Sequence, residues 1–457
     1  MTRLNKLGKF IVLILSIILI YLIISIYFTN HYFFNTVING IDLSLKAYDD
    51  SEDVIKNNLK GYGLTLIERD GTTDRIDGQD IGLEYNNENG ISTIYQSQKA
   101  IFWIRSLFKQ QCYYISDLFR YDSLQMDDAI SKLHCLNREI EEAENVSFKY
   151  FQGSYQVIEE KYGNRVMKFV LSKEIKKSIL KGDKSLDLEE RQCYIKPGYT
   201  LSSDKTWQTL NLLNKYISSK ITYLFGNQEE TLSGNIINQW IRVDGNLDPI
   251  IDENEVRIYI KGLAKQYDTV GKTRKFKAST GKIVEIKGGL YGWKINQPEE
   301  AKALLENIKN GQVIKKEPIY LQRAFSREGN EIGDTYVEIN ITKQYMWFYK
   351  EGKLIAKGAV VTGNPNRGHA TVVGAYMLNY KQEGATLRGP GYEAGVKYWM
   401  PFYGNIGLHD ASWRSHFGGE IYKRNGSHGC VNAPTYLAKI IFEHIEPDTP
   451  IICYEEE

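Results

Sequence analysis

The chain has 457 residues, of which 42% are apolar and 25% are charged, and this balance excludes an intrinsically disordered protein. Its 57 basic and 56 acidic residues give a formal net charge of +1, with no long block of one sign. The charge distribution therefore offers no electrostatic footprint for nucleic acid, and the length predicts two to four domains with ordinary hydrophobic cores.

An apolar run near the N-terminus is the first distinctive segment. Residues 10–28 form a stretch of about 19 residues without a formal charge, rich in Ile and Leu, which is long enough to cross a bilayer as a helix. Arg3, Lys6 and Lys9 precede it, so the positive-inside rule places residues 1–9 as a cytoplasmic tail and the rest of the chain outside the cytoplasm. We predict a single-pass membrane anchor, because aromatic residues rather than a small-residue cleavage site follow the run; a cleaved signal peptide or a buried helix is the alternative.

Residues 29–325 mix short strand-like and helical segments, which predicts α+β modules. The stretch 64–67 is strand-like, residues 70–71 (Asp-Gly) are a turn signal, and apolar residues recur at helical spacing over residues 91–109. The predicted divisions are a first module region at 29–230 and a second module at 231–325.

One pattern within these modules occurs twice. Residues 162–163 (Tyr-Gly) are followed 19 residues later by Gly182, and residues 291–292 (again Tyr-Gly) are followed 19 residues later by Gly311. Between each pair lies a charged, amphipathic stretch that ends near glycine, as a helix with a glycine stop does. We expect one supersecondary unit used twice; chance similarity is the alternative, since two copies are fewer than a stacked array needs.

The pattern changes near Gly333. Residues 336–342 alternate apolar and polar side chains, residues 345–349 continue as a strand, and a Glu-Gly-Lys turn at 351–353 leads into a returning strand. Frequent glycines in the remaining residues are typical of long loops between strands. We therefore predict an all-β domain over residues 333–457, in a multidomain chain with a transmembrane helix and α+β repeat modules before it.

Five cysteines are an odd number for an exported chain, so at least one is unpaired or pairs between molecules. Four lack the spacing of metal or redox motifs and are interpreted as structural, with their disulfide pairing left open: Cys112, Cys135, Cys193 and Cys453. Cys430 differs, because it lies in the sequence Asn-Gly-Ser-His-Gly-Cys-Val-Asn rather than in an apolar run. It is the candidate reactive thiol, unless a bridge to Cys453 removes it.

Two histidines are candidates for the base that takes the proton from the Cys430 thiol. His428 lies two residues before it, and residues two apart in an extended stretch face the same side, so His428 is expected to flank the thiol. His409 comes from a separate strand, can be aimed more freely and is favoured as the base, with Asp410 orienting its ring through the carboxylate or the backbone carbonyl. The N–H groups of Gly429 and Cys430 are expected to donate to an oxyanion.

The spacing of these residues resembles that of a known family. His409, 17 intervening residues and the run Ser-His-Gly-Cys-Val-Asn at 427–432 resemble the motif of the bacterial L,D-transpeptidases, which have a YkuD-type catalytic domain. The Val-Val-Thr-Gly run at 360–363 and the Gly-Leu-His-Asp run at 407–410 also fit. Upstream segments such as 240–244 are similar to peptidoglycan-binding modules, so the resemblance covers most of the chain after the apolar run.

The resemblance implies a YkuD-like β-sandwich that faces the cell wall and performs a two-step acyl transfer. Cys430 would attack the carbonyl of the third residue of a donor stem tetrapeptide, His409 would take the thiol proton, and the thioester would pass to a second stem peptide as a third-to-third cross-link. It also implies that carbapenem β-lactams acylate Cys430, and no cofactor or metal is expected. The residues expected to line the site are Met400, Trp413, Ser427, His428 and Asn432.

Three alternatives stay open. With water as the acceptor, the same thioester gives an L,D-carboxypeptidase, and a domain that has lost the chemistry would be a non-catalytic cell-wall-binding protein. His409, His428 and Cys430 also offer nitrogen and thiolate ligands for zinc, although their spacing matches no standard structural site. One departure from the family pattern, Ala-Thr-Val-Val-Gly at 370–374 in place of Ala-Thr-Pro-Thr-Gly, is expected to change loop stiffness rather than the chemistry.

Overall fold

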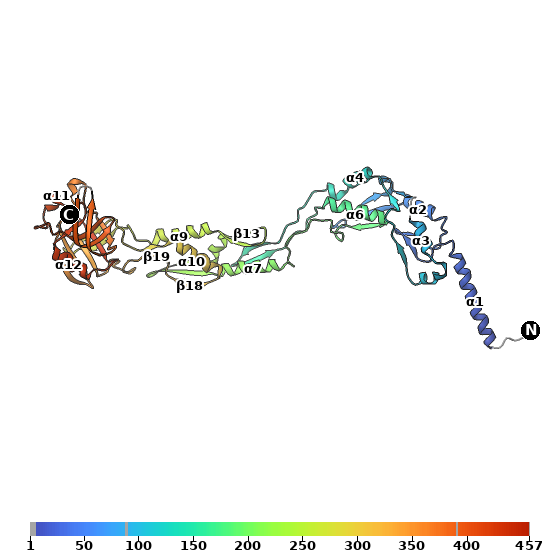
Figure 1. Cartoon of the computed structure of the whole chain (residues 1–457), viewed down its shortest axis with the longest axis horizontal. Helices are drawn as coiled ribbons and strands as arrows, with labels where there is room; N and C mark the ends of the chain where they lie inside the picture. Colours follow the sequence, from blue (N-terminus) through green and yellow to red (C-terminus); the bar gives the residue numbers. More distant parts are fainter. Residues whose placement is uncertain (1–5, 87–89, 390–391, 457) are drawn as a thin grey trace, which may run out of the picture. The chain divides into compact units, whose positions relative to one another are not determined.

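The structure is a computed structural model that describes residues 6–86, 90–389 and 392–456. The chain forms two compact units, the first made of residues 1–147 and 157–206, the second of residues 148–156 and 207–457. Figure 1 shows the helices and strands of both units, coloured along the sequence.

Helix α1 (Lys6–Tyr27) contains most of the apolar run, and nearly all of its apolar side chains are exposed. Its most apolar window has a mean hydropathy of 3.0, and among the described residues it is the single helix with the length and composition to cross a membrane. The helix begins at Lys6 rather than at residue 10, because lysine is a good helix former and a charge does not end a helix. Helix α1 therefore has the properties of a membrane anchor or of a signal peptide.

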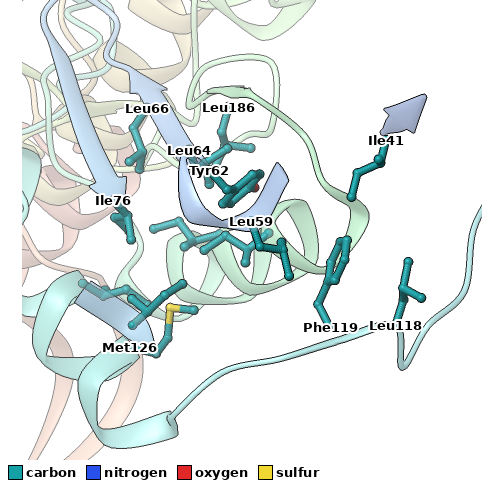
Figure 2. Close-up of a cluster of buried hydrophobic side chains, with 14 of the residues drawn as sticks. Ile41, Leu59, Tyr62, Leu64, Leu66, Ile76, Leu118, Phe119, Met126 and Leu186 are labelled. Carbon is teal, nitrogen blue, oxygen red and sulfur yellow. The ribbon is translucent and has the colours of Figure 1, made fainter. Parts of the chain in front are cut away.

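The first unit is built around a three-stranded sheet with the order β10-β3-β4. Strands β3 (Gly63–Ile67) and β4 (Thr73–Asp77) form an antiparallel hairpin, and β10 (Ser185–Asp187) pairs parallel with β3. Leu64, Leu66 and Leu186 of this sheet pack in one hydrophobic core with Leu59 and Met126, as Figure 2 shows. The helices of this core are α2 (Ser51–Lys60), α4 (Ser123–Ser131) and α6 (Lys168–Lys181).

Short elements complete the first unit. Its other helices are α3 (Ile91–Ser97) and α5 (His134–Asn137). Its other strands are β1 (Thr36–Ile38), β2 (Ile41–Asp42), β5 (Glu84–Tyr85), β6 (Gln111–Tyr113) and β7 (Phe119–Arg120).

The second unit contains a module with the same arrangement of strands. Strands β11 (Lys220–Phe225) and β12 (Gln228–Leu232) form an antiparallel hairpin, and β18 (Val313–Lys316) pairs parallel with β11. The predicted boundary at 230/231 falls inside β12, and the pairing of β12 with β11 keeps both strands in this unit, whose main segment begins at Trp207. Apolar faces of α9 (Glu253–Tyr267) and α10 (Gln297–Lys309) cover the sheet.

The remaining elements of this module are short or lie at its edges. Its other helices are α7 (Asp204–Ile217) and α8 (Gly234–Ile237). Its other strands are β8 (Ser147–Phe151), β9 (Ser154–Ile158), β13 (Ile241–Val243), β14 (Pro249–Ile251), β17 (Lys294–Ile295) and β19 (Tyr320–Gln322).

The two amphipathic stretches of the repeated sequence pattern are helices α6 and α10. Gly182 (φ +77°) ends α6, and Gly311 (φ +66°) follows the end of α10; both have the left-handed backbone conformation that glycine adopts without strain. Each glycine leads into a third strand, β10 or β18, that runs parallel to the first strand of a hairpin. The two stretches therefore occupy the same position in sheets of the same strand arrangement.

The C-terminal part of the second unit contains two sheets that share one core. The five-stranded sheet has the order β22-β21-β20-β28-β23, and the four-stranded sheet has the order β24-β25-β26-β27. Phe348 and Ile451 of the first sheet and Phe402 and Leu408 of the second are buried together. The strands are β20 (Tyr336–Asn340), β21 (Tyr345–Lys350), β22 (Lys353–Ala359), β23 (Gly374–Met377), β24 (Gln382–Gly389), β25 (Tyr392–Tyr403), β26 (Ile406–Asp410), β27 (Val431–Ala433) and β28 (Pro450–Tyr454).

The sequence predicts an all-β domain here, but the structure contains helices as well as the two sheets. Helix α12 (Thr435–His444) buries Leu437, Ala438 and Ile441 in the same core and contacts β22, β25 and β26. These residues follow helical spacing, i, i+1 and i+4, so the helix supplies one apolar face to the core. A second, short helix, α11 (Ile421–Asn425), lies in the connection between β26 and β27.

A hairpin inserted between α9 and α10 contacts the five-stranded sheet. It consists of β15 (Arg274–Lys277) and β16 (Ile283–Ile286). The backbone N–H of Ser279, in its turn, donates to the Glu338 carboxylate at 2.9 Å. Gly289, just after the hairpin, approaches Ala375 so closely that a Cβ there would lie 2.0 Å from the Ala375 carbonyl oxygen. The upstream module and the sheet are therefore joined by hydrogen bonds between Ser279 and Glu338 and by direct backbone contact.

Candidate active site

Two parallel strands bring the predicted nucleophile and base together. Strand β26 pairs with β27, and the register puts His409 opposite Asn432. The preceding pair, Leu408 and Val431, is buried in the core. Because successive side chains of a strand point to opposite faces, His409 and Asn432 project away from that core, and Cys430, two residues before Asn432, shares their face.

Hydrogen bonds hold the turn that carries Cys430. The Gly429 N–H donates to Ser427 Oγ at 3.1 Å, and the Ser427 hydroxyl donates to the Cys430 carbonyl. The Thr371 hydroxyl donates to the Gly429 carbonyl at 2.6 Å and accepts from the Gly363 N–H at 2.9 Å. Gly429 has a φ of +121°, a conformation that residues with a Cβ rarely adopt. The position of the thiol therefore depends on backbone geometry that glycine permits.

The His409 ring is oriented by a backbone carbonyl. His409 is 3% exposed, and its Nδ1 lies 2.8 Å from the Asp410 carbonyl oxygen, which requires the proton on Nδ1 and leaves Nε2 as the acceptor. The Asp410 carboxylate instead accepts from the N–H groups of Lys397 at 2.7 Å and Tyr398 at 2.9 Å on β25. The sequence left open whether Asp410 orients His409 through its carboxylate or its backbone carbonyl, and in the structure the carbonyl does so.

Burial sets the protonation of the thiol and the imidazole. Burial raises the pKa of the Cys430 thiol to about 11, and the Gly407 N–H opposes that shift only in part. Burial is also the largest cause that lowers the pKa of His409 below its ordinary 6.5; the Asp410 carbonyl and charge raise it, and the Arg414 guanidinium lowers it further. At neutral pH the resting pair is therefore a protonated thiol and an uncharged imidazole.

A cavity of about 250 Å³ opens at these residues. The predicted residues that line it are His409, Trp413, Ser427, His428, Cys430 and Asn432. Leu387 and Ala394, which are register partners in the β24–β25 hairpin, form another part of its wall. Arg414, Asn425 and Gly426 complete the described lining, in which no acidic side chain occurs.

Two predicted site features lie elsewhere. Met400, expected to line the site, is fully buried in the core opposite Leu408, because the alternation of β25 turns its side chain inward. The Gly429 N–H, expected to face an oxyanion, is bonded to Ser427 Oγ. The sulfur of Cys430 lies 3.6 Å from the Asn405 carbonyl oxygen, on the loop before β26.

Several residues at the site were not among those expected, and three of them are polar or charged side chains. Arg414 lines the cavity, Thr371 supports the Gly429 carbonyl, and the His369 ring lies 4.7 Å from the His428 ring. His369 and Thr371 come from a loop far from the motif in sequence, so no local signal identified them. Arg414 lies five residues after His409, and a basic residue so close to a candidate base was the one signal available.

Two alternatives from the sequence, a disulfide at Cys430 and a zinc site, depend on which side chains lie close together. All five cysteines are unpaired thiols, and Cys453 is fully buried in β28, so the bridge to Cys430 is not formed. Cys112 is exposed, whereas Cys135 and Cys193 are buried. Within residues 6–86, 90–389 and 392–456, no group of three or more His, Cys, Asp or Glu side chains is placed to hold a metal ion.

Comparison with known proteins assigns both parts of the second unit. Residues 334–453 match the YkuD family, the L,D-transpeptidase catalytic domain, and residues 199–315 match the PG_binding_4 family, a peptidoglycan binding domain. An Enterococcus faecium L,D-transpeptidase mutant of known crystal structure is 31% identical to the chain, over 54% of this chain and 100% of that one, with a TM-score of 0.45. The chain belongs to the L,D-transpeptidases.

Other solved structures are similar to parts of this L,D-transpeptidase. The Ldtfm–avibactam carbamoyl enzyme is 31% identical over 55% of this chain and 100% of that chain, with a TM-score of 0.46. The catalytic domain from the E. faecium L,D-transpeptidase acylated by ertapenem is 37% identical over 28% of this chain and 100% of that chain, with a TM-score of 0.26. No curated protein matches the chain.

The two family matches fit the elements of this L,D-transpeptidase. The catalytic match, 334–453, runs from just before β20 into β28 and contains every residue that lines the cavity. The module match, 199–315, begins before α7 and ends within β18, so it spans the predicted boundary at 230/231. The cavity therefore belongs to the catalytic domain alone.

Proposed function

We propose that this L,D-transpeptidase uses Cys430 as nucleophile and His409 as general base to form third-to-third peptidoglycan cross-links. The observation that carries the proposal is that both side chains line one cavity of the catalytic domain, with a protonated thiol and an uncharged imidazole. An uncharged imidazole takes the thiol proton as the sulfur attacks, so no preformed thiolate is needed.

The reaction has two steps that share one acyl-enzyme. The Cys430 sulfur bonds to the carbonyl carbon of the third residue of a donor stem tetrapeptide, and the thiol proton passes to His409 Nε2. The C–N bond to the terminal D-alanine breaks, the D-alanine nitrogen takes the proton from His409, and a thioester remains. The side-chain amine of a second stem peptide then attacks the thioester, gives up a proton through His409, and returns the thiol.

The oxyanion of each tetrahedral intermediate needs hydrogen-bond donors. We assign this role first to the Cys430 N–H, because the Gly429 N–H is occupied by Ser427 Oγ at 3.1 Å. Gly429 becomes a second donor once the Ser427 hydroxyl moves away from it. Removal of one such donor costs about 2.7–4 kcal/mol in other enzymes, so the backbone of this turn contributes as much as a side chain.

The upstream modules and α1 are proposed to place the catalytic domain at the cell wall. In this proposal α1 anchors the chain by one membrane pass, residues 1–9 remain in the cytoplasm, and the catalytic domain lies outside. The match of residues 199–315 to a peptidoglycan binding domain supports wall binding by the second module. The sheet of the first unit has the same strand arrangement, which supports the same role for the first module region.

β-Lactams are proposed to acylate Cys430. The E. faecium catalytic domain is known in a form acylated by ertapenem, and a further similar enzyme is known as an avibactam carbamoyl enzyme. Carbapenems present a strained carbonyl that the Cys430 sulfur attacks in the same way as the donor peptide. Intact-mass measurement is expected to show one carbapenem adduct on the native chain and none on Cys430→Ala.

The test of the proposed function is the reaction of the full-length chain, in detergent, with purified disaccharide-tetrapeptide. The native chain is expected to release D-alanine and form cross-linked dimer, and Cys430→Ala is expected to remain folded and form neither. Cys112→Ala, which removes an exposed thiol outside the catalytic domain, is the matched control and is expected to retain full activity. Dimer formation by Cys430→Ala would refute the assignment.

The same experiment separates the alternatives that the sequence left open. Release of tripeptide without dimer identifies an L,D-carboxypeptidase, because water then takes the place of the acceptor amine. Absence of both products, with binding to isolated cell walls retained, identifies a non-catalytic wall-binding protein. The uncharged imidazole beside the thiol argues against this second outcome, since the pair has the protonation that attack requires.

A further inference from the structure

Arg414 is a charged side chain in the cavity that the mechanism above does not use. It follows β26, and its backbone N–H donates to the Ala411 carbonyl at 3.0 Å in a turn that also carries Trp413. Its half-buried side chain lines the cavity together with His409 and Cys430. The guanidinium is near enough to His409 for its charge to lower the pKa of that imidazole.

The Arg414 guanidinium has no anion beside it. Its Nε is buried without a hydrogen-bond partner, and no carboxylate among the described residues lies within ion-pair distance of it. The adjacent carboxylate, Asp410, is already bonded to the backbone of β25. An anion stabilises a half-buried guanidinium, because the buried Nε has lost its water without gaining a hydrogen-bond partner. The unpaired guanidinium therefore indicates a binding position for an anion from outside the chain.

A second unpaired atom in the cavity has the opposite polarity. Asn432 Oδ1 is buried and has no donor among the residues that the structure describes. Asn432 lies opposite His409 in the β26–β27 pair and also lines the cavity. The cavity thus lacks both an anion at Arg414 and an N–H donor at Asn432. The end of a peptide supplies both groups, since a terminal residue carries an amide N–H and a carboxylate on one Cα.

We propose that Arg414 binds the terminal carboxylate of the donor peptide, on the residue that leaves when Cys430 is acylated. This inference rests on the proposed function, because that function places the scissile carbonyl at Cys430. The leaving nitrogen and the terminal carboxylate share one Cα, so a carbonyl at the thiol brings the carboxylate into the same small cavity. A guanidinium binds a carboxylate through two parallel hydrogen bonds, which selects a free carboxyl end over an amide.

The contact has a consequence for the base. In the empty site, Arg414 and burial both disfavour a charged His409, while the carbonyl and charge of Asp410 favour it. Of the other groups that line the cavity with the imidazole, Trp413, Asn432 and the protonated Cys430 thiol carry no charge at neutral pH, and His428 is a second titratable imidazole. A bound carboxylate neutralises Arg414, so His409 becomes a stronger base only when a donor peptide is present.

The first test measures binding without turnover, by calorimetry on the full-length chain with Cys430→Ala. The probes are the disaccharide-tetrapeptide with a terminal carboxylate and the same compound with a terminal carboxamide. The carboxylate form is expected to bind about 10- to 100-fold more tightly than the amide. Addition of Arg414→Gln is expected to abolish that preference, and Arg414→Lys to retain part of it. The matched control is Arg424→Gln, an exposed arginine of α11 outside the cavity, which is expected to keep the full preference.

The second test measures turnover with Cys430 intact. Arg414→Gln is expected to lower kcat/KM for the carboxylate peptide by about 10- to 100-fold and to leave no further loss on amidation. It is also expected to move the acid limb of the kcat/KM profile to higher pH, because one cause of the lowered pKa of His409 is removed; loss of folding alone would not move this limb. Equal preference for the carboxylate in the native and Arg414→Gln chains would overturn the inference. If binding depends on Arg414 and the carboxylate but no D-alanine is released by the native chain, the proposed function fails and this inference stands.

Discussion

The two sheets of the catalytic domain differ in whether certain buried polar atoms have hydrogen-bond partners. On the five-stranded sheet, the fully buried Glu338 accepts from the Ser279 N–H at 2.9 Å and the Tyr454 hydroxyl at 2.6 Å. On the four-stranded sheet and the loop that follows β26, Asn432 Oδ1 and Arg414 Nε are buried without a partner among the described residues. The first set lies where the β15–β16 hairpin contacts the five-stranded sheet, and the second set lies at the cavity.

This difference in hydrogen bonding distinguishes a contact within the chain from a candidate binding surface. Buried polar atoms that are fully paired stabilise a contact within the chain, here between the β15–β16 hairpin and the five-stranded sheet. Buried polar atoms without partners weaken the folded state, and where such atoms line a cavity a bound ligand can complete the pairing. The first sheet is therefore a structural junction, and the second is the surface that we propose as the substrate site.

Replacement of the base is expected to have the largest effect. His409→Gln keeps a polar side chain of similar size and removes the proton acceptor, so kcat/KM for D-alanine release is expected to fall about 10²- to 10⁴-fold. The variant is expected to remain folded, since the glutamine side chain is similar in size and its amide N–H can donate to the Asp410 carbonyl in place of Nδ1. A variant with native kcat/KM would show that another group takes the thiol proton.

Replacement of Glu338 is expected to act on stability instead of chemistry. Glu338→Leu leaves the Ser279 N–H and the Tyr454 hydroxyl without their acceptor, so the free energy of unfolding of the second unit is expected to fall by about 2–4 kcal/mol. Denaturant unfolding followed by tryptophan fluorescence measures this loss. The folded variant is expected to keep the kcat of the native chain.

A surface carboxylate provides the control for Glu338. Glu443→Leu removes an exposed partner of Lys439 on α12, and such a pair contributes little, so a change of at most about 0.5 kcal/mol is expected. A loss of unfolding free energy as small for Glu338→Leu as for Glu443→Leu would contradict the structural role of Glu338. A fall in kcat for Glu338→Leu as large as that for His409→Gln would also contradict it.

A further effect, smaller per pH unit than the loss expected for Glu338→Leu, is a dependence of stability on pH. The pKa of His409 is lower in the folded chain than its ordinary 6.5, so below pH 6.5 the unfolded chain binds a proton that the folded chain does not. The free energy of unfolding is expected to fall, as pH decreases below 6.5, by up to about 1.4 kcal/mol per pH unit from this group. The measurement is the difference between the native chain and His409→Gln from pH 7 to pH 5. Identical pH dependence in the two chains would contradict the assigned burial of His409.

The structure places Cys430 and His409 in one cavity with four of the residues expected to line it, whereas other details of the site were not predictable from the sequence. Cys430 and His409 were recognisable because a short motif and one spacing contain both residues. The inward turn of Met400 and the choice of the Asp410 carbonyl over its carboxylate depend on how β25 pairs with β26, which residue types do not reveal. Helix α12 was missed because frequent glycines and alternating strands dominated the composition of the domain.

In the upstream modules, too, local signals were predictable from the sequence and long-range strand pairing was not. The repeated pattern predicted helices at the positions of α6 and α10, because helical spacing and a glycine stop are local signals. The predicted boundary at 230/231 falls within β12, because a local pattern does not reveal that β12 pairs with β11 and that β11 also pairs with the distant β18.

Residues close together in the chain were enough to predict the apolar helix α1, the thiol in its glycine-rich turn and His409 as its candidate base. Which polar atoms remain unpaired around that thiol depends on the packed fold, which added Arg414 to the site and left Oδ1 of the expected Asn432 without a partner among the described residues. The physical reason is that pairing depends on distances between atoms of separate strands and loops, and those distances exist only after the two sheets have packed on one core.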